Sequence, residues 1–162
     1  MAEEGAATRP VAQIAVRVIV GSSLLAASDD PLFLGLRGAH GREFRLALAR
    51  GPYLRRGQEG TFVLGAADDP DTNVASPDLN DPTSPAIDAR SIEGVYLRKG
   101  LDPIPNVRAL GEMDDRLELV EVTIEIHAKD EPKPLCFERR GPLWLGLICG
   151  LQIEVPRAAR AQ

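Results

Sequence analysis

The strongest indication of the fold lies in residues 26–38, which read AASDDPLFLGLRG. The first half of this segment is small and acidic, a composition typical of a surface turn. In the second half, large apolar side chains recur at every second position, at Leu32, Leu34 and Leu36. Side chains two positions apart point to the same face of a β-strand. The segment therefore predicts a turn followed by a strand that is buried on one face.

The same alternation recurs along the chain. It predicts further inward-facing rows at Ile14, Val16, Val18 and Val20, at Phe44, Leu46 and Leu48, and at Val120, Val122, Ile124 and Ile126. The glycines at 38 and 41 fit a hairpin between two of these strands. We expect eight strands, at 13–20, 32–38, 44–48, 62–64, 92–99, 117–127, 135–138 and 143–155, the last interrupted at Gly150. No long segment has helical periodicity, so the pattern indicates an all-β, antiparallel, eight-stranded β-sandwich.

The length of 162 residues fits one domain. We expect flexible tails at 1–11 and 157–162 on either side of a sandwich at 12–156. Within the sandwich, residues 66–90 contain prolines at 70, 77, 82 and 85, many aspartates and few large apolar residues. Such a composition predicts a long surface-loop insertion that is mobile and is the preferred site of proteolytic cleavage.

The formal net charge of −5 argues against a nucleic-acid partner, because such binding needs a basic surface. Residues 1–5 are acidic and do not lead into the apolar run of a secretion signal. The longest apolar run, 143–148, is much shorter than the roughly 18 residues of a membrane span. We therefore expect a soluble, cytoplasmic protein that is not transmembrane.

Three short units follow one another in an order that resembles the PLAT/LH2 domain. The turn at 27–30 precedes the strand that ends at Gly38, residues 56–62 read RGQEGTF, and the strand at 120–127 ends in His127. PLAT/LH2 domains are β-sandwiches appended to lipases, lipoxygenases and membrane receptors. The likeness spans 13–156. Gly60 stands where the family has aspartate, and Ala128 and Lys129 replace the family's polar pair after the histidine.

The resemblance implies an accessory module that brings a larger protein to a lipid surface or a protein partner and has no active site of its own. Some members bind calcium through the turn after the first strand. Here that turn contains Asp29 and Asp30, and Asp130 and Glu131 follow a later strand. These four residues are the candidate calcium ligands, and the alternative is a solvated acidic turn.

A second acidic segment, Asp69-x-Asp71-x-Asn73, does not complete a calcium loop. An EF-hand needs glycine at its sixth position and glutamate at its twelfth. Val74 and Asn80 occupy those positions, so a polar loop is the better interpretation.

No catalytic constellation or cofactor motif is visible, so we expect neither an enzyme nor a bound cofactor. The histidines are His40, in a turn, and His127, at a strand end. Cys136 and His127 would form a dyad if they met, but a core thiol and a surface imidazole explain them more simply. Cys136 and Cys149 are interpreted as two buried thiols, with a single disulfide as the alternative.

The candidate binding residues are Trp144 and two arginine pairs, Arg55–Arg56 and Arg139–Arg140. The arginine pairs are predicted to lie in small basic turns that are able to contact phosphate or carboxylate, with an ordinary solvated turn as the alternative. The run at 144–148, WLGLI, is interpreted as a strand buried on both faces, with a membrane-facing loop as the alternative.

The sequence thus favours a non-catalytic binding module for a protein partner or a lipid surface. The alternative from another class is a structural subunit that assembles through exposed sandwich edges. A carbohydrate-binding module would need more exposed aromatic residues than Tyr53, Tyr96 and Trp144 provide.

Overall fold

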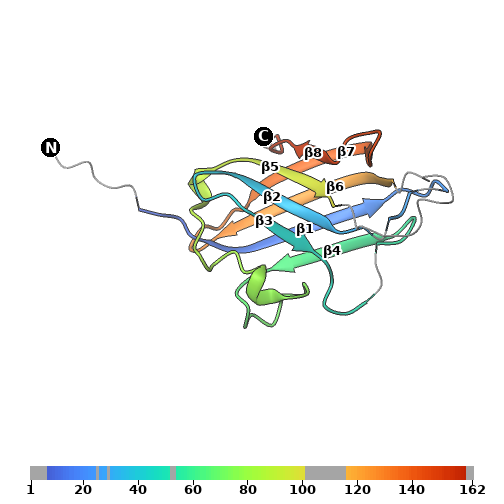
Figure 1. Cartoon of the computed structure of the whole chain (residues 1–162). Coiled ribbons are helices and arrows are strands. Elements are labelled where there is room, and N and C mark those ends of the chain that lie inside the picture. The colour runs from blue at the N-terminus through green and yellow to red at the C-terminus, as the bar shows by residue number, and fades with distance from the viewer. Residues whose placement is uncertain (1–6, 25, 29, 52–53, 101–115, 160–162) are drawn as a thin grey trace.

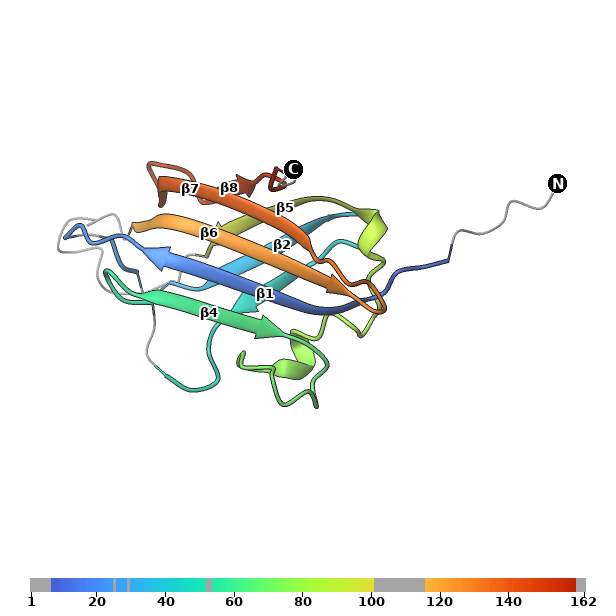
Figure 2. The ribbon, with the colours of Figure 1, turned by 180° about the vertical axis from the view of Figure 1, so that it is seen from behind.

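The chain folds into two four-stranded antiparallel sheets that pack face to face, as the computed structural model shows (Figure 1). The structure describes residues 7–24, 26–28, 30–51, 54–100 and 116–159. One sheet has the order β4-β1-β6-β7 and is seen from behind in Figure 2; the other has the order β3-β2-β5-β8. The strands are β1 (Val11–Val20), β2 (Leu32–Gly38), β3 (Glu43–Leu46), β4 (Glu59–Leu64), β5 (Ile92–Lys99), β6 (Leu117–Ala128), β7 (Leu135–Leu145) and β8 (Gln152–Val155). The predicted eight-stranded antiparallel sandwich is confirmed.

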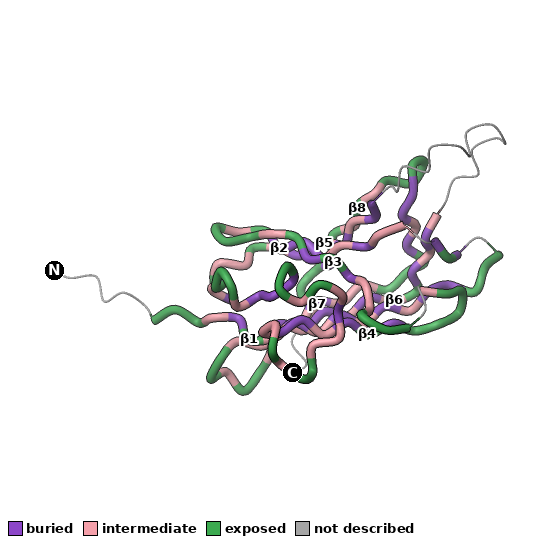
Figure 3. The backbone as a smooth tube through the Cα atoms, turned by 60° about the horizontal axis from the view of Figure 1, so that its bottom comes forward, coloured by how far each residue is buried: buried purple, intermediate pink, exposed green. Residues whose placement is uncertain are grey.

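The core lies between the sheets, and it is built from the alternating rows that the sequence predicts (Figure 3). In β1 the four predicted inward residues are all buried, and so are the three leucines of β2. Phe44 and Leu46 of β3 are buried as well, and β2 pairs with β3 in the expected hairpin. Leu48 lies beyond the end of β3 and is only half-buried.

The predicted phase of β6 is wrong at Val120, which is 43% exposed. Ile19 of β1 pairs with Glu121 and Val20 pairs with Leu119, so β6 contributes one extra residue, Val120, and the pairing of β6 with β7 is also irregular at this point. A bulge of this kind changes which side chains face the core. Leu117 and Leu119 therefore take the buried positions before the bulge, and Val122 resumes the inward row after it.

The prediction of two short final strands is also wrong in part. Residues 135–145 form one continuous strand, β7, because β6 pairs with it along both halves. Arg139 and Arg140 therefore lie on a strand instead of in a turn. Only β8 is a separate short strand, and it pairs with β5.

The segment 66–90 is a loop, as predicted, but it packs closely against the sandwich. It contains two short 3-10 helices, η1 (Pro77–Leu79) and η2 (Ala89–Ser91), and it buries Val74 and Ile87 in the core. Val74 and Ile87 thus anchor the loop, whereas Leu79 is exposed. This anchoring argues against the mobility that the composition predicts.

Two asparagines of this loop cover the edges of the neighbouring strands. The side-chain oxygen of Asn73 accepts a hydrogen bond from the backbone N–H of Val63 in β4 at 2.8 Å, and its amide donates to the carbonyl of Thr61 at 3.0 Å. The side-chain oxygen of Asn80 accepts from the N–H of Arg45 in β3 at 2.7 Å. Because unpaired edge groups invite pairing with other chains, the loop protects this side of the sandwich.

We predict that Asn80→Ala lowers the free energy of unfolding by about 1–3 kcal/mol, because Asn80 is buried and its loss leaves the part-buried N–H of Arg45 without this acceptor. Urea denaturation measures the loss, and limited proteolysis should show faster cleavage within 66–90. Asp78→Ala is the matched control, because Asp78 is an exposed residue of the same loop. Equal stability of the two variants would contradict this role of Asn80.

The opposite side of the sandwich is closed by the chain after β8. The N–H of Glu138 in β7 donates to the carbonyl of Pro156 at 3.0 Å, and the N–H of Ala158 donates to the carbonyl of Cys136 at 2.9 Å. At the other terminus, β1 begins at Val11, and the carbonyl of Arg9 accepts a bond from the N–H of Ala89 at 2.8 Å. Backbone hydrogen bonds thus join residues on both sides of the range 12–156 to the sandwich.

Candidate functional site

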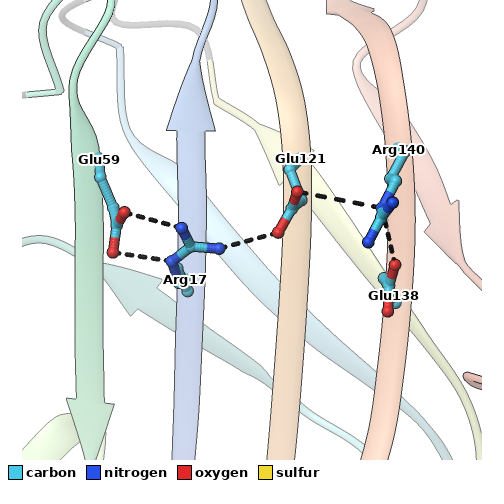
Figure 4. Close-up of polar contacts among 5 residues, drawn as sticks. All are labelled: Arg17, Glu59, Glu121, Glu138 and Arg140. Carbon is cyan, nitrogen blue, oxygen red and sulfur yellow. Dashed lines mark hydrogen bonds and ion pairs between the residues drawn. The ribbon is translucent and has the colours of Figure 1, made fainter.

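The outer face of the first sheet carries a row of charges that neutralise one another (Figure 4). Arg17 of β1 binds Glu59 of β4 with two hydrogen bonds of 2.7 and 2.8 Å, and it reaches Glu121 of β6 at 2.8 Å. Arg140 of β7 pairs with Glu138 at 2.9 Å and approaches Glu121 at 4.0 Å. The predicted binding residue Arg140 is thus engaged within a network that crosses all four strands.

The outer face of the second sheet is arranged in the same way. Both oxygens of Glu43 accept hydrogen bonds of 2.7 Å from Arg98, and the bonds from this guanidinium lower the pKa of Glu43. Arg37 pairs with Glu154, and Arg139 donates to the backbone carbonyl of Glu154 at 2.8 Å. With their charges paired internally, the two faces leave the ends of the sandwich as the better binding surfaces.

One end of the sandwich displays large apolar side chains. We call it the loop end: it is where β1 and β7 finish and β2 and β6 begin, on the right of Figure 1. Leu24, in the loop after β1, is 85% exposed. Leu147 and Ile148, in the turn after β7, are 61% and 82% exposed. Of the described residues, the other exposed large apolar side chains are Val120 and Leu79.

The turn that carries Leu147 and Ile148 is closed by its own backbone. Gly146 pairs with Gly150, and the N–H of Gly146 donates to the carbonyl of Gly150 at 2.9 Å. Gly150 has a φ of 99°, a conformation that side chains disfavour. This geometry presents the residues between the two glycines, including Cys149, to solvent.

The interpretation of 144–148 as a strand buried on both faces is therefore wrong. Leu143 and Leu145 point into the core, and Trp144 between them is half-buried, with Arg116 5.4 Å from its ring centroid. The strand ends at Leu145, so the two apolar residues beyond Gly146 are exposed. A run of apolar residues does not show where a strand ends, so the sequence alone left both the buried strand and the exposed loop possible.

Arg55 and Arg56 also lie at the loop end. Their turn is attached to the end of β1, because the N–H of Gly57 donates to the carbonyl of Gly21 at 2.9 Å. Both arginine side chains are exposed and form no ion pair with the part of the chain that the structure describes. Their exposure leaves the predicted contact with an anionic group sterically open.

A buried ion pair, which the sequence did not reveal, holds this end together. Lys99, the last residue of β5, is only 1% exposed, and its ammonium group pairs with the carboxylate of Asp30. A buried cation is tolerated when a carboxylate neutralises it. Asp30 thus acts as the partner of Lys99.

Of the four candidate calcium ligands, the three that the structure describes do not come together. Asp29 lies outside the described residues, and Asp30 is occupied by Lys99. Asp130 and Glu131 follow β6, which runs antiparallel to β1, so they lie about 30 Å away at the opposite end. Among the residues the structure describes, no group of three His, Cys, Asp or Glu side chains is placed to hold a metal ion.

The second acidic segment forms a turn of its own. The carboxylate of Asp69 accepts a hydrogen bond from the N–H of Asp71 at 2.9 Å. Aspartates commonly stabilise turns in this way. The structure is consistent with the polar-loop interpretation.

The cysteines differ from the prediction of two buried thiols. Cys136 on β7 is half-buried and Cys149 is exposed, and neither forms a disulfide. Burial, with a smaller contribution from Glu125, raises the pKa of the Cys136 thiol. The proton is therefore retained, which makes Cys136 a poor nucleophile. His127 lies 3.4 Å from the carboxylate of Glu125, and His40 is exposed in the turn between β2 and β3.

The fold has counterparts among solved structures. The alpha-toxin from an avian strain of Clostridium perfringens superposes with a TM-score of 0.56 at 12% identity, over 94% of this chain and 33% of the toxin. The alpha toxin of Clostridium absonum gives 0.56 at 17% identity, over 92% and 32%. Coral 8R-lipoxygenase, which is activated by calcium via a C2-like domain, gives 0.56 at 13% identity, over 90% and 17%.

The chain spans about a third of each toxin and about a sixth of the lipoxygenase. At these identities the likeness establishes a shared β-sandwich fold, in agreement with the fold that the PLAT/LH2 resemblance implies. No protein-family profile matches the chain. No curated protein sequence matches it either. Within the described residues, no helix has the length and apolar character needed to cross a bilayer.

Proposed function

We propose that this chain is a PLAT-like, non-catalytic binding module that docks on a lipid surface through its loop end. The observation that carries the proposal is the exposure of Leu24, Leu147 and Ile148 on two turns at the same end of the sandwich. The fold likeness to a lipoxygenase and to two toxins supports a role as a module of a larger assembly.

The energetics favour apolar insertion over attraction by charge. Transfer of a leucine or isoleucine side chain out of water contributes about 1.5–3 kcal/mol. Arg55 and Arg56 add about 1 kcal/mol each near anionic headgroups, but the net charge of −5 opposes such a surface. We therefore expect binding to neutral phosphatidylcholine vesicles that changes little with salt.

The structural alternative, self-assembly through strand edges, has less support. Asn73 and Asn80 cover β4 and β3, and the chain after β8 covers the first residues of β7. Size-exclusion chromatography with light scattering is expected to show a monomer. A protein partner at the loop end is the remaining alternative, and it would leave the protein unbound in the vesicle assay.

We predict that the double variant Leu24→Ser/Ile148→Ser loses at least about tenfold of its partitioning into phosphatidylcholine vesicles, because it removes two inserted side chains. Vesicle sedimentation measures the bound fraction. Leu79→Ser is the matched control, because Leu79 is 79% exposed but lies in the loop 66–90. The proposal fails if native protein stays in the supernatant, or if both variants sediment equally.

Cys149 supplies a reporter that needs no new residue, because it lies beside Ile148 and is exposed, whereas Cys136 is half-buried. A polarity-sensitive dye attached to Cys149 should shift to the blue on vesicle binding. Vesicle binding and thermal unfolding are expected to be the same with millimolar calcium and with chelator, because the candidate ligands do not gather. A large calcium-dependent rise in melting temperature would contradict that expectation.

A further inference from the structure

A cleft lies at the end of the sandwich opposite the loop end. We call it the basic cleft; its volume is about 270 Å³. Four parts of the chain meet there: the segment with Arg9 that precedes β1, the junction of η2 with β5, the turn between β6 and β7, and the segment with Arg157 that follows β8. These segments are far apart in the sequence, so no local motif could reveal the cleft.

The rim of the cleft is strongly cationic. Among the described residues, four basic side chains line it, Arg9, Arg90, Lys133 and Arg157, against the single carboxylate of Glu131. This concentration is unusual in a chain whose net charge is −5. Like charges gathered at one site repel one another, and a bound anion would relieve that repulsion.

Two of the four basic side chains form ion pairs with described residues, and the other two do not. Arg9 pairs with Glu131 at 3.0 Å, and Arg90 pairs with Asp88 at 3.2 Å. The side chains of Lys133 and Arg157 are exposed and make no hydrogen bond or ion pair with the described residues. The cleft therefore offers an ammonium and a guanidinium group whose donors are free.

The floor of the cleft is apolar. Ile92 and Leu135 are only partly buried there, beside the core residues Ile126 and Phe137. A purely polar anion would leave this floor in contact with water. A ligand that fits both the rim and the floor has a charged head and an apolar portion. The volume of the cleft lies just below the roughly 300–1,000 Å³ that is typical of ligand pockets, so the ligand must be a small molecule.

From this combination we infer that the basic cleft binds a small amphipathic oxyanion, a carboxylate or phosphate monoester joined to a short alkyl chain. Lys133 and Arg157 bind the oxyanion with charge-assisted hydrogen bonds. The alkyl chain covers Ile92 and Leu135. The site is distinct from the proposed lipid-docking surface, because β1 spans the distance between the two ends.

Isothermal titration calorimetry with octanoate and with octyl phosphate, both below micelle formation and without vesicles, tests this inference. We expect saturable binding of at least one, and the tighter ligand identifies the head group. Inorganic phosphate and octanol, which each lack one half of the ligand, should bind at least about tenfold more weakly. From butanoate to octanoate, affinity should rise by up to about fourfold per methylene while the chain remains in contact with the floor.

The decisive variant is Lys133→Ala/Arg157→Ala, which should weaken binding at least about tenfold without unfolding the protein, because both side chains are exposed. Arg55→Ala/Arg56→Ala is the charge-matched control at the loop end and should bind normally. Glu131→Gln should raise affinity, because it removes the only carboxylate that the described part of the chain contributes to the lining of the cleft. The inference is overturned if neither alkyl anion binds, or if the two double variants behave alike.

The two proposed sites can fail independently. The Leu24→Ser/Ile148→Ser variant should keep its affinity for the alkyl anion, and the Lys133→Ala/Arg157→Ala variant should still sediment with neutral vesicles. Loss of vesicle binding in the second variant would show that the basic cleft belongs to the lipid-docking surface, and would overturn its assignment as a separate site.

Discussion

The Asp30→Ala variant is expected to lose about 3–5 kcal/mol of its free energy of unfolding, measured by urea denaturation at neutral pH. Lys99 is 1% exposed, and the carboxylate of Asp30 neutralises its ammonium group. Removal of that carboxylate leaves an uncompensated charge between the sheets. The loss is therefore larger than the net contribution of the ion pair itself.

Two further variants separate this mechanism from others. Replacement of both partners, Asp30→Asn with Lys99→Met, should restore much of the stability, because no buried charge then remains. Asp71→Ala removes an exposed aspartate and should change stability by no more than about 0.5 kcal/mol. A small loss in Asp30→Ala would show that Lys99 reaches water easily, contrary to the structure.

The second large effect is expected in the core, where Ile124→Ala should cost about 2–5 kcal/mol. Ile124 is fully buried at the centre of β6, where it pairs with Val16 of β1 on one side and Phe137 of β7 on the other. The cost combines the lost burial of the side chain with the cavity it leaves. In chemical denaturation, the unfolding free energy falls linearly with denaturant concentration, and an unchanged slope of that line would assign the loss to the folded state.

Val120→Ala is the control for this experiment, because Val120 lies on the same strand as Ile124 and belongs to the same alternating sequence pattern. The bulge turns Val120 outward, so the truncation should change stability by about 0.5 kcal/mol or less. A similar loss of stability in both variants would indicate that Val120 faces the core in an uninterrupted alternation, and it would contradict the bulge.

The strands were predictable because burial on one face leaves a local, period-two signal. Ile14, Val16 and Val18 are inward in the sequence pattern and buried in the structure. The bulge at Val120 was not predictable in this way. It depends on how β6 pairs with β1 and β7, strands that meet it only in the folded protein.

The predictions of function divided along the same line. Arg55 and Arg56 stand exposed, because a short turn places its own side chains in solvent. A calcium site made of all four candidate ligands would require Asp30 and Asp130 to lie at the same end of the sandwich. The antiparallel course of β1 and β6 places them at opposite ends.

By itself, the sequence determined the all-β class, the eight strands, most of their inward faces and the lack of a local catalytic motif. These properties arise from neighbours in the chain, whose side chains alternate along an extended backbone. Only the tertiary structure decided which loops share an end, which edges Asn73 and Asn80 cover, that Lys99 is buried against Asp30, and that four distant cations surround one cleft. Each of these depends on residues brought together by sheet order and strand direction, which the one-dimensional pattern of burial does not specify.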